Sequence, residues 1–250
     1  MNNRPTDPFA ALDDPRGVLY PKYVSSGAAG ADDGSIRPYF QRLIRIHLPP
    51  DRNVRIFDFG CGGGELLRCC GQAGYRTLKG IDLSEQQVAR AHAKGLSGVV
   101  TQGDALAFLE DAPSASYDIV LAFDILEHLN KPEVLRFFAQ VRRVLSPKGR
   151  LVLHVPNGDS PFFGAIRYGD FTHELTFTAS ALRQIASATG FASIHCYEDK
   201  PIVHGLKSLI RAILWVLCRG LFVFMTVVET GIWERGAAYS RNLLAVIDRP

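Results

Sequence analysis

One short segment, residues 57–65, constrains this chain more than any other, and it reads Phe-Asp-Phe-Gly-Cys-Gly-Gly-Gly-Glu. The apolar run 54–59 predicts a buried strand, and residues 65–73 after the glycines predict a helix. Glycines at a strand-to-helix turn let the backbone approach a ligand closely. We therefore expect an α/β fold with a nucleotide-type ligand held against this turn.

The glycine spacing and the flanking charges narrow the kind of ligand. Sites for dinucleotides place their glycines as G-x-G-x-x-G. Here Gly60, Gly62 and Gly64 alternate instead, and the third dinucleotide position is occupied by Glu65. Asp58 and Glu65 also bring two carboxylates to a helix N-terminus, where a phosphate would otherwise bind. The pattern favours a cationic cofactor without a pyrophosphate.

Acidic residues follow three further predicted strands. These strands span residues 75–81, 99–102 and 117–123, and the acids after them are Asp82, Asp104 and Asp124. The carboxyl ends of parallel strands meet at one edge of a sheet, which is where open α/β sheets bind ligands. We expect the three acids to lie near the glycine turn.

Together these residues resemble the cofactor site of class I S-adenosylmethionine (SAM)-dependent methyltransferases. The resemblance implies SAM as the cofactor and S-adenosylhomocysteine as its product. It places Asp82 at the ribose hydroxyls, Asp104 beside the adenine amino group, and residues 124–128 at the motif after the fourth strand. The residues implied to bind the cofactor are Asp58, Gly60, Cys61, Gly62, Gly64, Asp82, Leu83, Asp104, Ala105, Phe123 and Asp124.

Strand and helix alternate through the rest of the chain. We predict strands at 150–155, 192–197 and 241–247, helices at 132–145 and 179–189, and a turn at 146–149. The fold class is a doubly wound, seven-stranded, mostly parallel Rossmann-like sheet, and the resemblance implies an antiparallel last strand beside the sixth. An amphipathic helix at 38–48 either covers the cofactor pocket or only packs against the sheet.

Length and order of elements predict one domain with additions. A chain of 250 residues with 47% hydrophobic content can bury one large core. The predicted parts are an N-terminal arm (1–36), a SAM-binding core (37–204) with an active-site loop (157–178), a hydrophobic helical insertion (205–231) and a return to the core (232–250).

The loop 157–178 contains the first candidate for a general base. Long ordered loops at the carboxyl edge of a sheet are usually functional. Methyl transfer to a hydroxyl also requires a group that accepts the proton, for which a neutral imidazole suits pH 7. We assign this role to His173, whose alternative role is to hydrogen-bond the loop.

The second catalytic candidate is His128, which follows the fourth strand. Asp124, Glu127 and His128, completed by His173, could hold a divalent cation. The carboxylates could equally hydrogen-bond the methionine part of SAM or cap a helix, so we assign no metal ligand. The remaining histidines are interpreted as structural or solvated: His47, His92, His154, His195 and His204.

The insertion 205–231 is strongly apolar but is interrupted by Arg211 and Arg219. Its uncharged stretch, 220–228, is far shorter than the roughly twenty residues that cross a bilayer, so we do not expect it to span a membrane. Basic residues and a tryptophan recur every four positions, at Lys207, Arg211, Trp215 and Arg219, which suits a helix at a membrane interface. A helix packed on the core or across a homodimer remains an equal alternative.

Charge and cysteine content limit the partners and the compartment. A net charge of +3 without a basic run gives no reason to expect nucleic acid. The cysteines are odd in number, five, and scattered, unlike a disulfide framework or a zinc site. With no apolar run at the N-terminus, a cytoplasmic protein is expected, peripheral at the inner membrane face if the insertion binds lipid.

Several segments outside the cofactor motifs resemble methyltransferases of bacterial surface-polysaccharide and O-antigen biosynthesis. They are the N-terminal stretch through 48–50, the loop segment 167–174, the apolar helix and the closing Asn242-Leu243-Leu244-Ala245. This resemblance implies O-methylation of a sugar or lipid-linked glycan. The alternatives are methylation of a small soluble acceptor, such as a quinone precursor or secondary metabolite, and a non-catalytic SAM-fold scaffold.

Overall fold

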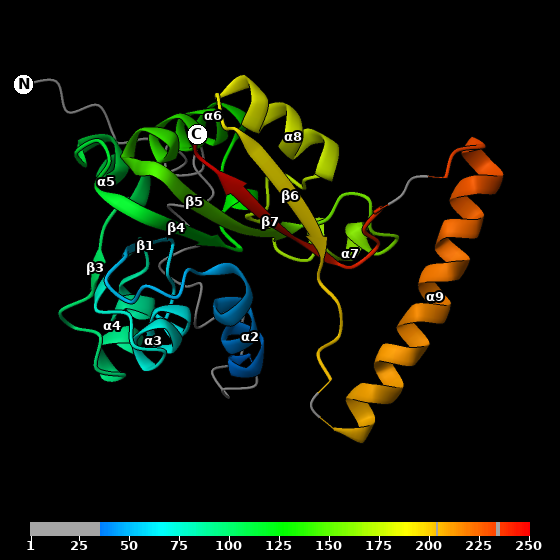
Figure 1. Cartoon of the computed structure of the whole chain (residues 1–250), viewed down its shortest axis with the longest axis horizontal. Coiled ribbons are helices and arrows are strands. Elements are labelled where there is room, and N and C mark those ends of the chain that lie inside the picture. The colour runs from blue at the N-terminus through cyan, green and yellow to red at the C-terminus, as the bar shows by residue number, and fades with distance from the viewer. Residues whose placement is uncertain (1–35, 204, 234–235) are drawn as a thin grey trace, which may run out of the picture.

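The computed structural model describes residues 36–203, 205–233 and 236–250. The predicted N-terminal arm therefore lies outside the described residues except for Ile36, and so does His204. Within the described residues, the chain forms a layered α/β body, and one long helix stands beside it (Figure 1).

The centre of the body is a seven-stranded sheet with the order β3-β2-β1-β4-β5-β7-β6. The strands are β1 (Arg55–Phe59), β2 (Thr77–Asp82), β3 (Val100–Gln102), β4 (Tyr117–Phe123), β5 (Leu145–Pro156), β6 (Ser193–Glu198) and β7 (Asn242–Asp248). Pairing is parallel from β3 through β5, whereas β7 runs antiparallel between β5 and β6. The predicted doubly wound sheet with an antiparallel last strand is confirmed.

Helices cover both faces of this sheet. The helices of the described residues are α2 (Arg37–His47), α3 (Glu65–Gln72), α4 (Glu85–Ala93), α5 (Ala105–Asp111), η3 (Leu126–His128), α6 (Lys131–Val144), α7 (Phe163–Arg167), α8 (Ala179–Ala188) and α9 (Leu206–Thr230), of which α9 stands apart from the sheet. Alternate residues of β1 separate the two layers. Phe57 belongs to the core cluster that includes residues of α5, α6 and α8, and Ile56 belongs to the cluster that includes residues of α2 and α3.

Helix α2 has both of the roles expected from its sequence, because it packs against the sheet and also lines the cavity. Leu43 and Ile44 are buried in the core cluster with β1, β4 and β5. Phe40 belongs to the same cluster and also lines the cavity described below. The helix therefore closes one wall of the cavity while it packs on the sheet.

The predicted turn at 146–149 is part of β5 rather than a separate element. Tyr117 pairs with Leu145 and Ile119 pairs with Arg150, so the pairing register shifts between them. Lys148 lies in the left-handed region with φ 61°. The extra residues form an irregularity of the kind that lengthens and bends one strand against its partner.

Strand order reverses at β1, which pairs with β2 on one side and β4 on the other. Chains that leave the two neighbouring strands turn to opposite faces of the sheet, so a crevice opens outside their carboxyl ends. This crevice is where the glycine turn and the strand-end acids meet.

Candidate functional site

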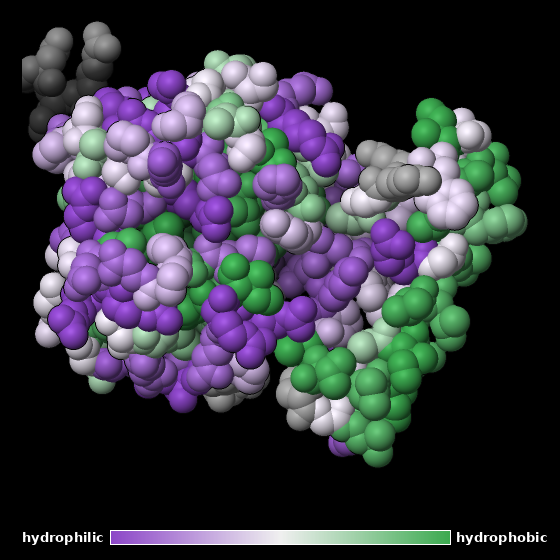
Figure 2. All heavy atoms as spheres, in the orientation of Figure 1, coloured by the Kyte–Doolittle hydropathy of each residue, from purple (hydrophilic) through white to green (hydrophobic). Residues whose placement is uncertain are grey.

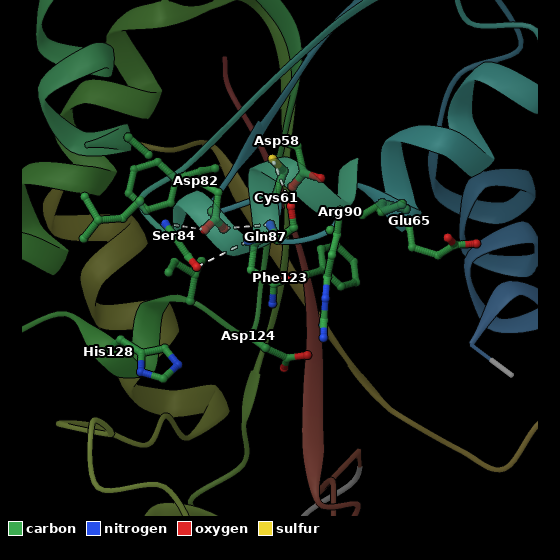
Figure 3. Close-up of a pocket in the computed structure, with 18 of the residues that line it drawn as sticks. Asp58, Cys61, Glu65, Asp82, Ser84, Gln87, Arg90, Phe123, Asp124 and His128 are labelled. Atoms are coloured by element: carbon green, nitrogen blue, oxygen red, sulfur yellow. Dashed lines mark hydrogen bonds between the residues drawn. The ribbon is translucent and has the colours of Figure 1, made fainter. Parts of the chain in front are cut away.

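A cavity of about 460 Å³ lies at the carboxyl ends of β1, β2 and β4 (Figure 3). Its size is within the range of about 300–1,000 Å³ that is usual for small-molecule sites. Its walls include ten of the residues predicted to bind the cofactor: Asp58, Gly60, Cys61, Gly62, Asp82, Leu83, Asp104, Ala105, Phe123 and Asp124. The topology thus brings four separate sequence segments to one cavity.

The glycines adopt a conformation that other residues rarely take. Gly60, Gly62 and Gly64 have φ of 70°, 52° and 72°. A Cβ at Gly60 would lie 2.6 Å from Ile125 Cγ1, and one at Gly64 would lie 2.5 Å from Leu96 Cδ1. Gly64 is the N-cap of α3 and packs against Leu96 instead of lining the cavity wall, so its requirement for glycine is explained by backbone and packing.

Two acids face each other across the turn. Asp82 accepts hydrogen bonds from the backbone N–H of Gly62 at 2.7 Å and of Ser84 at 2.9 Å. Asp58 is 2% exposed, and burial together with the charge of Asp82 raises its pKa to about 8. Burial also raises the pKa of Asp82. A cationic ligand beside this pair would relieve the repulsion between the carboxylates.

Glu65 does not repel ligands as the sequence suggested. Its carboxylate pairs with Arg37 at 2.7 Å, Arg68 at 3.1 Å and Lys94 at 3.6 Å. Although partial burial opposes ionisation, these cations hold the pKa of Glu65 below its usual range. At the glycine turn, the preference for a cation therefore depends on Asp58 and Asp82 and not on Glu65.

Asp104 has a structural role in addition to its place in the cavity. Its Oδ1 accepts from the backbone N–H of Leu106 at 2.8 Å and of Ala107 at 3.2 Å, which makes Asp104 the N-cap of α5. Ser84 caps α4 in the same way through the N–H of Gln87. Caps at two strand ends therefore fix the wall on which the resemblance places ribose and adenine.

Asp124 is oriented by a residue that the sequence reading did not assign to the site. His154 is 6% exposed, and its Nδ1 lies 2.7 Å from Asp124 Oδ1. Its Nε2 lies 3.4 Å from Asp199 Oδ2, and its ring stacks on Phe123 at 5.4 Å. Burial opposes the charged form, but Asp124 and Asp199 raise the pKa of His154 to about 10. Of the two roles expected for His154, structural or solvated, the structure shows the structural one, which here orients a residue of the cavity.

One signal could have identified His154. It is two residues from the carboxyl end of β5, and the parallel register pairs it with Phe123, directly before Asp124. Asp124 itself has φ 51°, an uncommon conformation for a residue other than glycine. An acid after β4 and a histidine near the end of β5 therefore meet across the strand pair.

The two predicted catalytic histidines lie together. Their ring centroids are 4.7 Å apart. His128 lines the cavity, and Figure 3 shows it on the same side as Asp124. His173 packs behind it, in the loop after α7. Burial and the neighbouring His173 lower the pKa of His128 to about 4, so His128 is neutral at pH 7.

Of the four side chains that the sequence brought forward for a cation, the structure groups three. Ligand atoms of Glu127, His128 and His173 lie within 4.8 Å of one another. The carboxylate of Asp124 is instead held by His154. Burial and the charge of Asp124 raise the pKa of Glu127 well above its usual value.

Comparison with known sequences agrees with this geometry. A family model described as a methyltransferase domain matches residues 33–196, well over half of the chain. The chain is 34% identical over 110 residues to 27-O-demethylrifamycin SV methyltransferase of Amycolatopsis mediterranei, which covers 42% of this chain and 40% of that protein. It is 32% identical over 125 residues to ubiquinone biosynthesis O-methyltransferase of Idiomarina loihiensis, covering 49% and 50%. The chain thus spans about half the length of the curated relatives that it matches.

Solved structures share the fold over a larger part of the chain. A SAM-dependent methyltransferase from Archaeoglobus fulgidus superposes with a TM-score of 0.64 and covers 85% of this chain and 94% of that one. Sequence identity is 18%, so this likeness concerns the fold.

Proposed function

The chain belongs to the methyltransferase domain family, and on that premise we propose that it methylates a hydroxyl group of a sugar or lipid-linked glycan, with SAM as the methyl donor. The observation that carries the proposal is the cavity itself. A buried acid pair suited to a cation lines it together with the neutral His128, an arrangement that fits a charged cofactor and a proton-bearing acceptor.

The cofactor half of the cavity fits SAM by its chemistry. When bound, SAM supplies an activated methyl group on a sulfonium, and it also carries an ammonium. Asp58 and Asp82 provide the negative charge, and the caps at Ser84 and Asp104 hold the wall for the nucleoside. Asp124, clamped by His154, provides a further oriented carboxylate at the cavity.

The acceptor half supplies a group for the hydroxyl proton. Backbone oxygen of Ile166 lies 2.9 Å from His173 Nδ1. A carbonyl can only accept, so Nδ1 carries the hydrogen and Nε2 carries the lone pair. We assign the general base to His173, with His128 as the alternative, because His128 lines the cavity near Asp124 and the His173 ring lies 4.7 Å from the His128 ring.

A hydroxyl acceptor is supported by the named relatives, which are O-methyltransferases of rifamycin and ubiquinone biosynthesis. The ubiquinone relatives equally support the alternative of a small soluble acceptor. A glycan or lipid-linked acceptor is favoured by the resemblance to surface-polysaccharide methyltransferases and by the apolar surface of α9. The intact acid pair and glycine turn disfavour a non-catalytic scaffold.

Helix α9 contacts the body along one narrow stripe. Arg219 pairs with Glu198 at 3.2 Å and donates to the Ala237 carbonyl at 3.0 Å, and Phe222 packs on Tyr239. Large apolar residues cover the rest, and Figure 2 shows this exposed surface. The exposed set is Leu206, Leu209, Ile210, Ile213, Leu214, Val216, Leu217, Leu221, Phe224, Met225 and Val228.

By length and composition α9 is long and apolar enough to cross a membrane. The sequence analysis had considered only the uncharged stretch 220–228, which is too short to do so. Its connections disfavour a crossing, because Glu198 at the end of β6 pairs with Leu243 in β7. The chain therefore leaves the body at Glu198 and returns to it at the neighbouring Leu243. A crossing helix would force one of its two connecting segments back through hydrocarbon with unpaired backbone groups.

We infer that α9 lies in the plane of a membrane, with its outer half in the lipid and its stripe against the protein. Its polar flank carries Lys207 and Arg211, which suit an anionic cytoplasmic leaflet. Phe162, before α7, packs on Phe222 at 6.2 Å and connects this surface to the active-site loop. A lipid-linked acceptor would then reach the cavity from the bilayer, at the inner membrane face of the cytoplasm.

The test is methyl transfer into defined acceptors. With methyl-labelled SAM and a bacterial membrane extract, we expect label in glycolipid, released with the sugar by mild acid. Label that stays in water-soluble sugars would remove the lipid carrier from the proposal, and label in a quinone precursor would favour the alternative. Calorimetry without measurable SAM binding would contradict both enzyme functions.

A further inference from the structure

Glu127, His128 and His173 form a cluster with more groups than a single general base requires. It contains one carboxylate and two imidazoles, with ligand atoms within 4.8 Å of one another. Donor atoms around a cation with bonds of about 2.1 Å are separated by roughly 3.4 Å in a tetrahedral site. Small side-chain rotations are enough to reach that spacing.

Both imidazoles are held in the same tautomer by partners outside the cluster. His173 Nδ1 donates to the Ile166 carbonyl at 2.9 Å. Thr172 Oγ1 lies 2.8 Å from His128 Nδ1 and gives its own hydrogen to Asp170 Oδ1 at 2.7 Å. Thr172 must therefore accept from His128, so Nε2 of each ring carries the lone pair. Histidines that bind metals are fixed in this way by a carbonyl or a carboxylate-linked group on the other ring nitrogen.

The carboxylate of Glu127 is a second, independent observation that fits a bound cation. Glu127 is 2% exposed, and its Oε2 has no hydrogen-bond partner among the described residues. A buried polar atom without a partner is costly, and a bound ion is one of the few explanations. Its backbone carbonyl accepts from the N–H groups of Glu174 at 2.7 Å and Leu175 at 3.1 Å. The segment after β4 and the loop with His173 are therefore fastened together beside the cluster.

We propose that Glu127, His128 and His173 bind one divalent transition-metal ion, of the class of Zn²⁺, Co²⁺ or Mn²⁺. Two imidazole ligands favour these ions over Mg²⁺ or Ca²⁺, which prefer oxygen. Three protein ligands leave coordination positions open, as in sites that bind a substrate oxygen. The ion binding stands by itself, and only its role rests on the proposed function.

Occupation of the site would change how the acceptor hydroxyl is activated. With the site empty, the Nε2 lone pair of His173 accepts the proton. With a cation bound, that lone pair is engaged, and the hydroxyl coordinates the cation and loses its proton to solvent more readily.

The test uses Co²⁺ as the probe on the full chain after removal of metals with a chelator. We expect one ion per chain by calorimetry, with visible d–d absorption and no thiolate charge-transfer band. Glu127→Gln and His173→Ala should each weaken binding at least about tenfold, and Thr172→Val, which removes an outer partner, about tenfold. Matched controls are Glu174→Gln, the same charge change on an exposed neighbour, and His195→Ala on β6. Both should bind Co²⁺ as the unmodified chain does.

Three outcomes would overturn the site. They are no Co²⁺ or Zn²⁺ binding, binding unchanged in Glu127→Gln and His173→Ala, or a thiolate band that assigns the ion to a cysteine. SAM affinity and thermal unfolding of each variant show whether it is folded. If Glu127→Gln does not fold, the His173→Ala variant still tests the site, because His173 is only half-buried. Because the titration needs neither SAM nor acceptor, loss of ion binding with intact SAM binding refutes this site alone.

Discussion

The two halves of the cavity are built in different ways. The cofactor half is made from strand ends and backbone: a glycine turn after β1, acids after β2 and β3, and helix caps that hold them. The proposed acceptor half is made from His128 of η3, which lines the cavity, and from His173 in the loop after α7, and the two rings meet only through a tertiary contact. Local sequence can specify the first half, whereas the second depends on how distant segments pack.

Among the predicted effects, we expect the largest at His173, where a substitution should affect the acceptor half and not the cofactor half. His173→Ala should lower kcat by about a hundredfold or more and leave SAM affinity nearly unchanged, because the loop histidine serves only the acceptor half. Single-turnover kinetics and calorimetry measure the two quantities, with His195→Ala as control. Unchanged turnover would remove His173 from the reaction.

A substitution in the cofactor half should instead weaken SAM binding. Asp58→Asn removes a buried carboxylate from beside the expected ammonium and should weaken SAM binding roughly 10- to 100-fold. Because the pKa of Asp58 is about 8 without ligand, binding of a cation should also release protons near pH 7 in the unmodified chain. Calorimetry in buffers of different ionisation enthalpy detects this release.

The matched control is Asp111→Asn, an exposed acid at the end of α5. Equal SAM affinity in Asp58→Asn and Asp111→Asn would mean that the acid pair does not recognise the cofactor.

Helix α9 tests whether the acceptor half extends to a membrane. Neutralising Lys207 and Arg211 should lower partition into anionic liposomes roughly 30-fold, since each basic group near the surface contributes about 1 kcal/mol. Arg219 is left intact because it pairs with Glu198. Flotation measures the bound fraction, and a wild-type chain that does not float would favour a packed or dimeric helix.

The smallest effect concerns the pH dependence of stability through His154. Its folded pKa, about 10, is above the unfolded value of about 6.5. Its contribution is therefore fully present below pH 6.5 and is lost as pH rises toward 10. We expect the free energy of unfolding to fall more in wild type than in His154→Gln over this window. The free energy of unfolding is measured by denaturant titration at several pH values. The same pH dependence in the two proteins would contradict the interaction of His154 with Asp124 and Asp199.

The sequence analysis predicted the fold and the cofactor wall because their signals are local. Strand runs, glycine spacing and acids at strand ends each depend on neighbours along the chain, and the sheet topology brings them together at β1. The neutralisation of Glu65 by Arg37, Arg68 and Lys94 was not predictable in this way. Those ion pairs connect three helices whose relative positions depend on packing.

The acceptor side shows the same limit in more detail. His128 and His173 were singled out by residue type and segment, but their contact and shared tautomer arise from Thr172, Asp170 and Ile166. His154 was missed because a histidine within a strand carries no local signal. Its role follows only from the pairing register of β4 and β5.

The position of α9 in the topology has a practical consequence. The helix is an insertion between β6 and β7, two paired antiparallel strands whose ends, Glu198 and Leu243, are already in register. Such a strand pair closes with a short turn of a few residues. A variant in which a Gly-containing turn replaces the segment between these strands should therefore keep the sheet and the cofactor cavity. It would be a minimal catalytic core, and the helix would be a module that sets where the reaction takes place.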